Sequence, residues 1–198
     1  MFHTVSFGRL AAAIVVLSFP IGASVVNFES FLDGDLLTNQ IPGITFTNTT
    51  IYSSGISLNE FEFPPRSGTN VASDFGGPIT ISFDVSLSAF SAYFTYLGPL
   101  TVTAFNASHI QLGSVTSLFA SNLGISGDPG SSPNELLQFS GTGIRSVTIT
   151  GQIGGGSFTM DDLGFTPGTT TATPEPRTAL LTATLLACAA AIQRNATR

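Results

Sequence analysis

The carboxylates best suited to chemistry lie where apolar strands are expected. Asp161 and Asp162 interrupt the otherwise mostly apolar segment 158–165, and Glu29 closes the first expected strand, 25–29. A charged group within such a strand costs free energy unless it is paired, ligated or hydrogen-bonded. These residues therefore indicate either an ion site or carboxylates that fasten a loop.

The segment around Asp161 resembles the last strand of calcium-containing jelly rolls, including many carbohydrate-binding modules. In those domains an acid on the first strand and an aspartate on the last strand share one Ca²⁺. The resemblance implies calcium as a cofactor, with Glu29 and Asp161 as its ligands. Calcium takes about six to eight oxygens, so backbone carbonyls and Asp33 or Asp35 would complete the shell. A strand-end acid that faces solvent or hydrogen-bonds a loop is the alternative.

Other catalytic constellations are poorly supported, and we predict that the chain is not an enzyme. After removal of a signal peptide, His109 is the one remaining histidine, and no nucleophile elbow accompanies it. One histidine without a thiol cannot fill a zinc site. Two carboxylates could hydrolyse a glycoside if held at the right separation, but residue type alone does not select a pair.

The charge balance excludes nucleic acid as a partner. The chain has 198 residues and no lysine, and segment 25–173 holds eleven acidic residues against two arginines, a formal charge of −9. Phosphate binding requires cationic side chains. Cations and neutral polymers such as polysaccharides remain compatible with this composition.

The pattern along the body predicts an all-β domain of the β-sandwich, jelly-roll type over residues 25–166. Apolar and polar residues alternate in 79–85 and again in 90–96, the period of half-buried strands. The turn Gly98-Pro99 should join the second of these segments to 100–105 as an antiparallel hairpin. About ten short strands at this spacing are typical of sandwiches and barrels.

Several aromatic residues could form a sugar-binding platform on this domain, since stacking on a ring face is the usual physics of such sites. With 17 phenylalanines and no tryptophan, the domain must also fill its core with phenylalanine, so we expect most of these rings to be buried. The candidates are Phe61, Phe63, Phe75, Phe94 and Tyr96.

The first 24 residues read as a secretory signal peptide. Arg9 supplies the positive charge, segment 10–19 is apolar, and small residues near Ala23 and Ser24 provide a cleavage region. Such a signal predicts export through the inner membrane.

The C-terminal 25 residues form a second signal, joined to the body by the linker 167–173. Pro174-Glu175-Pro176 favours an extended backbone, because proline lacks an N–H and biases the preceding residue towards extended conformations. Segment 178–192 carries no charge, and as a transmembrane helix it would reach about 22 Å. Arg194 and Arg198 would stay on the cytoplasmic side.

This tail resembles the PEP-CTERM sorting signal of Gram-negative bacteria. The resemblance covers the motif Pro174-Glu175-Pro176, the transmembrane segment and the basic end, although Arg194 and Arg198 are separated here where members often end in a tight arginine cluster. It implies an exosortase as partner, which cuts at or near the motif. The expected route is an inner-membrane-anchored precursor that is then released or transferred to the cell surface.

The function expected from these signals is that of a non-enzymatic exported protein of the cell surface or exopolysaccharide matrix. A carbohydrate-binding module at the exopolysaccharide is the first alternative, and a small glycoside hydrolase or lyase is the second. The same kind of tail is also labelled the C-terminal domain of an ice-binding protein. We see no regular Thr-x-Thr ladder along the sequence, so we do not predict ice binding.

Overall fold

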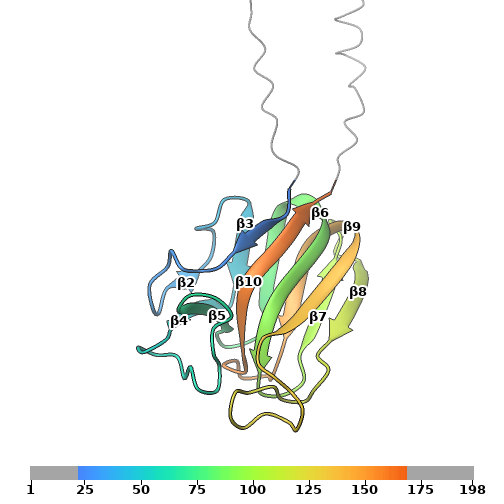
Figure 1. Cartoon of the computed structure of the whole chain (residues 1–198). Helices are drawn as coiled ribbons and strands as arrows, with labels where there is room; N and C mark the ends of the chain where they lie inside the picture. Colours follow the sequence, from blue (N-terminus) through green and yellow to red (C-terminus); the bar gives the residue numbers. More distant parts are fainter. Residues whose placement is uncertain (1–21, 169–198) are drawn as a thin grey trace, which may run out of the picture.

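The computed structural model describes residues 22–168, and every regular element in that range is a strand (Figure 1). The all-β prediction is therefore confirmed for the body. Within the described range no helix is long and apolar enough to cross a membrane. The ten strands are β1 (Ser24–Val26), β2 (Leu36–Leu37), β3 (Ile44–Thr47), β4 (Thr49–Ser53), β5 (Asn70–Asp74), β6 (Ile79–Tyr96), β7 (Thr101–Phe105), β8 (Gln111–Thr116), β9 (Glu135–Thr150) and β10 (Phe158–Pro167).

The strands form one antiparallel sheet that bends into two layers, consistent with a β-sandwich. The first layer has the order β3-β6-β9-β7-β8 and uses the N-terminal part of β6 and the C-terminal part of β9. The second layer has the order β2-β4-β5-β10-β6-β9 and uses the other halves of the two long strands, with β1 beside β10.

The two layers stay connected because β6 and β9 each bend without ending. The pairing of β6 with β9 shifts register between Ser82 and Leu87, and again between Leu87 and Ala89. Across the bend, β9 carries Gly143 at a φ of 84°, a conformation that favours glycine. Irregularities of this kind sharpen the local twist of a strand. Segments 79–85 and 90–96, predicted as two strands, are thus one strand of 18 residues.

The predicted hairpin between 90–96 and 100–105 is wrong. Strand β7 pairs with β9 on one side and with β8 on the other, both in the first layer. The chain leaves the second layer after Tyr96, and Gly98 at a φ of 103° turns it towards the first. Burial explains this path, because Val102 and Ala104 become fully buried opposite Ile149 and Val147 of β9.

The first and last strands lie side by side, as the resemblance to calcium-containing jelly rolls implies. Ser24 pairs with Phe165, and Val26 pairs with Leu163. Strand β1 is shorter than the predicted segment 25–29, because Phe28 adopts a φ of 62° and turns the chain out of the ladder. Glu29 therefore lies in the connection after β1.

Phenylalanine fills much of the core between the layers. Phe94 of the second layer contacts Phe158 edge-on at 6.1 Å between ring centroids, and Phe83 of the first layer lies 5.7 Å from Phe165. Both Phe94 and Tyr96 are fully buried, as expected of core residues. Phe61 and Phe75, by contrast, are 70% and 57% exposed.

Candidate functional site

Asp161 sits in a bulge of β10, where the pairing with β6 shifts register between Asp161 and Gly164. Its side chain is 1% exposed and turns towards the loop before β5. There the Oδ2 atom accepts hydrogen bonds from the backbone amides of Arg66 and Ser67, each at 2.8 Å. The Oδ1 atom accepts from the amide of Asp162 at 2.7 Å. The carboxylate therefore fixes this loop to the outer side of the second layer.

Glu29 holds the next residues of the same loop. Its Oε1 atom accepts from the amides of Thr69 at 3.0 Å and Asn70 at 2.9 Å. Gly68 is required here, because a Cβ at this position would lie 2.2 Å from the Glu29 carboxyl carbon, and its φ is 56°. Glu29 and Asp161 thus act on neighbouring parts of one loop, as the arrangement of the first and last strands suggested.

These contacts favour the loop-fastening interpretation of the two acids. Their oxygens accept hydrogen bonds from backbone N–H groups, which stabilise a carboxylate without the need for a cation. Among residues 22–168, no three His, Cys, Asp or Glu side chains gather closely enough to hold a metal ion. Calcium binding by Glu29 and Asp161 remains a prediction.

Burial dominates the electrostatics of Asp161 and raises its pKa from 3.8 to about 6. The neighbouring Asp162 charge acts in the same direction, while the amides of Ser67, Asp162 and Arg66 oppose the rise. Removing a carboxylate from water disfavours its charged form, and hydrogen bonds to that form favour it. Here the loss of hydration is the larger effect.

Three further acids each accept from two consecutive backbone amides. Asp74 binds the amides of Ser157 and Phe158, and Asp128 binds those of Ala120 and Ser121. Glu62 does the same with Ile125 and Ser126, and these two bonds lower its pKa, that from Ser126 most. The sequence does not predict the partners of these three acids. Its one indication is that the body has many acids and few cationic side chains, so most carboxylates must find other donors.

Glu135 joins a buried phenol to a loop. The Tyr96 hydroxyl donates to Glu135 Oε2, and the Leu118 amide donates to Oε1 at 3.0 Å. Burial raises the pKa of Tyr96 to about 12, and its hydrogen bond to Glu135 adds to the rise. The phenol is therefore a neutral donor that positions the loop.

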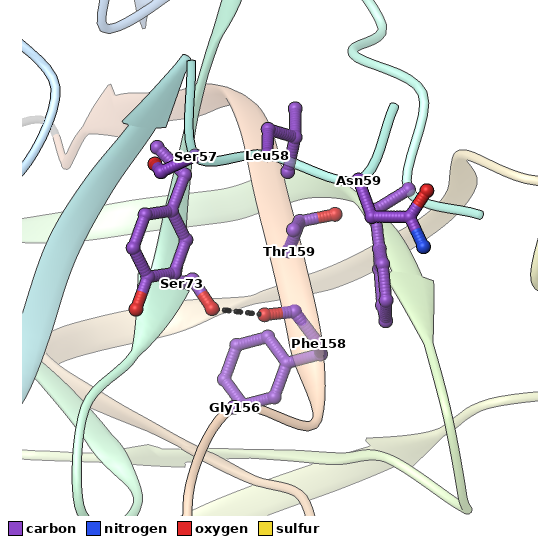
Figure 2. Close-up of a pocket in the computed structure, with 9 residues that line it drawn as sticks. Ser57, Leu58, Asn59, Ser73, Gly156, Phe158 and Thr159 are labelled. Carbon is purple, nitrogen blue, oxygen red and sulfur yellow. Dashed lines mark hydrogen bonds between the residues drawn. The ribbon is translucent and has the colours of Figure 1, made fainter. Parts of the chain in front are cut away.

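A cleft of about 280 Å³ lies on the outer side of the second layer. In Figure 2, Ser57, Leu58 and Asn59 of the loop after β4 face Ser73 and Thr159 of the sheet. The Ser73 hydroxyl donates to the Phe158 carbonyl at 2.8 Å. The rings of Tyr52 and Phe63 complete the lining together with Gly156 and Phe158.

This lining combines aromatic rings with hydroxyl and amide groups and contains no charged side chain. Such a surface suits a small uncharged ligand that offers both an apolar face and hydroxyls. Of the predicted sugar-platform residues, Phe63 alone belongs to the cleft. Tyr52 was not among the candidates.

The remaining predicted site residues have other positions. His109 is exposed in the turn before β8 with a φ of 57°. The sorting motif Pro174-Glu175-Pro176, the transmembrane segment 178–192, Arg194 and Arg198 lie outside the described residues, as does most of the signal peptide.

No protein-family model and no curated protein matches the chain. The K2 cleaved adhesin domain of Lys-gingipain is similar at 14% identity over 73% of this chain and 99% of that chain, with a TM-score of 0.46. A DUF4465 family protein from Bacteroides caccae is similar at 12% identity over 74% and 100%, with a TM-score of 0.48. The K1 cleaved adhesin domain of Lys-gingipain from Porphyromonas gingivalis is similar at 9% identity over 75% and 99%, with a TM-score of 0.42. Values this low do not identify a function.

Proposed function

We propose that the chain is a non-enzymatic exported protein, built on a jelly-roll-like β-sandwich and sorted by an exosortase to the cell surface or the exopolysaccharide matrix. The C-terminal sequence carries this proposal: Pro174-Glu175-Pro176, the uncharged segment 178–192, and the terminal Arg194 and Arg198. A membrane-anchored precursor precedes the processed form.

The position of the strands supports this processing route. The ten strands of the described chain begin at Ser24 and end at Pro167, and Ser24 pairs directly with Phe165. A cut after Ala23 would leave the whole sheet intact, and a cut after Ser24 would remove only the first residue of β1. A second cut near Glu175 lies beyond the last strand, which ends at Pro167.

The intact mass of the protein recovered from the cell envelope and the medium tests the proposal. We expect a mature chain that starts near Val25 and ends near Glu175, because both signals should be removed during export. Peptide mapping of the same sample locates each end. A surface-exposed product that still contains Cys188 would contradict processing by an exosortase.

Carbohydrate binding is the second candidate function, and the uncharged cleft lined by Tyr52 and Phe63 favours it. Sugars stack on aromatic rings and exchange hydrogen bonds with hydroxyl and amide groups. The same lining argues against a glycoside hydrolase or lyase at this cleft, because it offers no pair of carboxylates for acid-base catalysis.

Calcium binding at Glu29 and Asp161 can be tested by melting curves of the purified full chain in detergent. If both acids hold Ca²⁺, a chelator should lower the melting temperature and excess Ca²⁺ should raise it by mass action. Asp161→Asn should remove this response, because an amide is a weaker ligand for a hard cation.

Asp84→Asn is the matched control, since Asp84 is an exposed acid of β6. It should leave the calcium response unchanged. Identical curves with and without chelator in the parent chain would end the calcium proposal and leave both acids as fasteners of the loop.

A further inference from the structure

The outward face of the first layer carries rows of hydroxyl side chains, produced by the register of five separate strands. The central row crosses the whole layer, since each of its members is directly paired with the next one. It consists of Thr47, Thr80, Thr148, Thr103 and Ser114. The Thr80 and Thr148 hydroxyls share a hydrogen bond of 3.2 Å.

Shorter hydroxyl rows flank the central one on both sides. On one side Thr150 pairs with Thr101, which pairs with Thr116. On the other side Thr45 pairs with Ser82, which pairs with Ser146, a residue that is only 8% exposed. We call these three rows together the hydroxyl face. Its rows are about 6.7 Å apart along the strands and its columns about 4.8 Å apart, so the central row spans about 19 Å.

The hydroxyl face is distinct in charge from the rest of the body. None of its members is charged, whereas segment 25–173 carries a formal charge of −9. It also lacks the large apolar centre that a stable protein–protein interface requires. Each hydroxyl can both donate and accept a hydrogen bond, which matches a polymer whose surface is itself made of hydroxyls.

A polar cleft of about 240 Å³ continues the face beyond Ser82 and Ser146. Asp84 and Arg145 both line it, and their opposite charges cancel within the cleft. Phe83 also lines it, and Asn106, Ala107 and His109 of the turn between β7 and β8 form its rim.

This turn is rigidly built. The Oδ1 atom of Asn106 accepts from the amides of Ser108 and Ile110, each at 2.9 Å. The backbone amide of His109 donates to the Asn106 carbonyl at 3.0 Å. The cleft therefore has a fixed rim beside the hydroxyl face.

We propose that the hydroxyl face binds an extended, neutral polysaccharide chain, with the cleft beside Ser82 and Ser146 receiving one of its sugar units. Many weak hydrogen bonds along one polymer act together as a multivalent contact. The inference rests on the proposed extracellular role, because such polymers lie outside the cell. The face is separate from the Tyr52–Phe63 cleft, which lies on the other layer.

Affinity electrophoresis of the full chain in detergent, through gels containing hydroxyethyl cellulose, tests the proposal. The parent chain should be retarded. The triple variant Thr80→Val, Thr103→Val, Thr148→Val keeps the β-branched shape and removes three central hydroxyls. We expect its dissociation constant to rise at least about tenfold, because each lost hydrogen bond weakens binding.

Two further variants control for folding and position. Thr142→Val changes an exposed threonine at the bend of β9, outside the rows, and should leave retardation unchanged. Ser114→Glu places one charge on an exposed position at the edge of the central row and should weaken binding without disturbing the core.

A parallel gel containing alginate, an acidic polysaccharide, tests the charge argument and should give no retardation. Equal retardation by alginate, or unaltered binding by both the triple variant and Ser114→Glu, would overturn the proposal. The gel assay does not depend on export, so a failure of binding is distinguishable from a failure of the sorting proposal.

Discussion

Asp74→Ala should lower the free energy of unfolding by about 4 kcal/mol, because it leaves buried donors without an acceptor. Asp74 is 2% exposed. Its Oδ1 accepts from the amides of Ser157 at 2.9 Å and Phe158 at 3.2 Å, and its Oδ2 accepts from the Ser157 hydroxyl at 3.0 Å. Urea denaturation measures the loss as a lower midpoint with an unchanged slope.

Two further variants provide reference values for this loss of stability. Asp74→Asn keeps one acceptor oxygen and should lose about half as much, about 2 kcal/mol. Asp84→Ala removes an exposed acid and should change stability by no more than about 0.5 kcal/mol. An Asp74→Ala chain as stable as Asp84→Ala would mean that the amides of Ser157 and Phe158 find other acceptors.

Asp161 should make the protein less stable as the pH rises from 4 to 7 in the presence of chelator. Its pKa is raised from 3.8 to about 6, so the folded chain binds this proton more tightly than the unfolded chain does. The resulting stability is complete below pH 3.8 and is lost as the pH rises through about 6. A shift of this size corresponds to about 3 kcal/mol.

The comparison with Asp161→Asn isolates this group from the other acids. Acids with lowered pKa values, such as Glu62, have the opposite dependence and lose their contribution as the pH falls. The difference in unfolding free energy between the parent chain and Asp161→Asn should therefore shrink with rising pH between 4 and 7. A constant difference would show that the loop amides balance burial, a growing difference would show that they outweigh it, and either result would contradict the prediction.

Local patterning predicted the strands better than it predicted their partners. Alternation in 79–85 and 90–96 predicts most of the buried side chains, although Val85 is 52% exposed, and both segments are strand in the structure. This pattern does not indicate whether a strand ends or bends, so it predicts two strands where the structure has the single strand β6. The turn at Gly98-Pro99 suggested a local hairpin, but pairing depended on distant β9, whose Ile149 and Val147 bury Val102 and Ala104.

The sequence indicates which acids belong to the site, but it does not indicate which groups their carboxylates bind. An apolar context correctly marked Asp161 as unusual, and the adjacency of the first and last strands brought Glu29 to the same loop. The two carboxylates accept from the backbone amides of residues 66, 67, 69 and 70, and no sequence pattern marks a backbone amide as a donor. The sequence does not predict the hydroxyl face either, because its central row takes one residue from each of five strands and depends on their register.

The antiparallel pairing of β1 with β10 places the two ends of the body at one point of the molecule (Figure 1). Paired Cα atoms in such a ladder are about 5 Å apart, so the Cα atoms of Ser24 and Phe165 are as close as two residues that face each other across a tight turn. A host protein could therefore accept the body as a cassette inserted into one surface loop, with its own chain entering and leaving through adjacent strands. The same closeness makes circular permutation through a short peptide bridge geometrically simple.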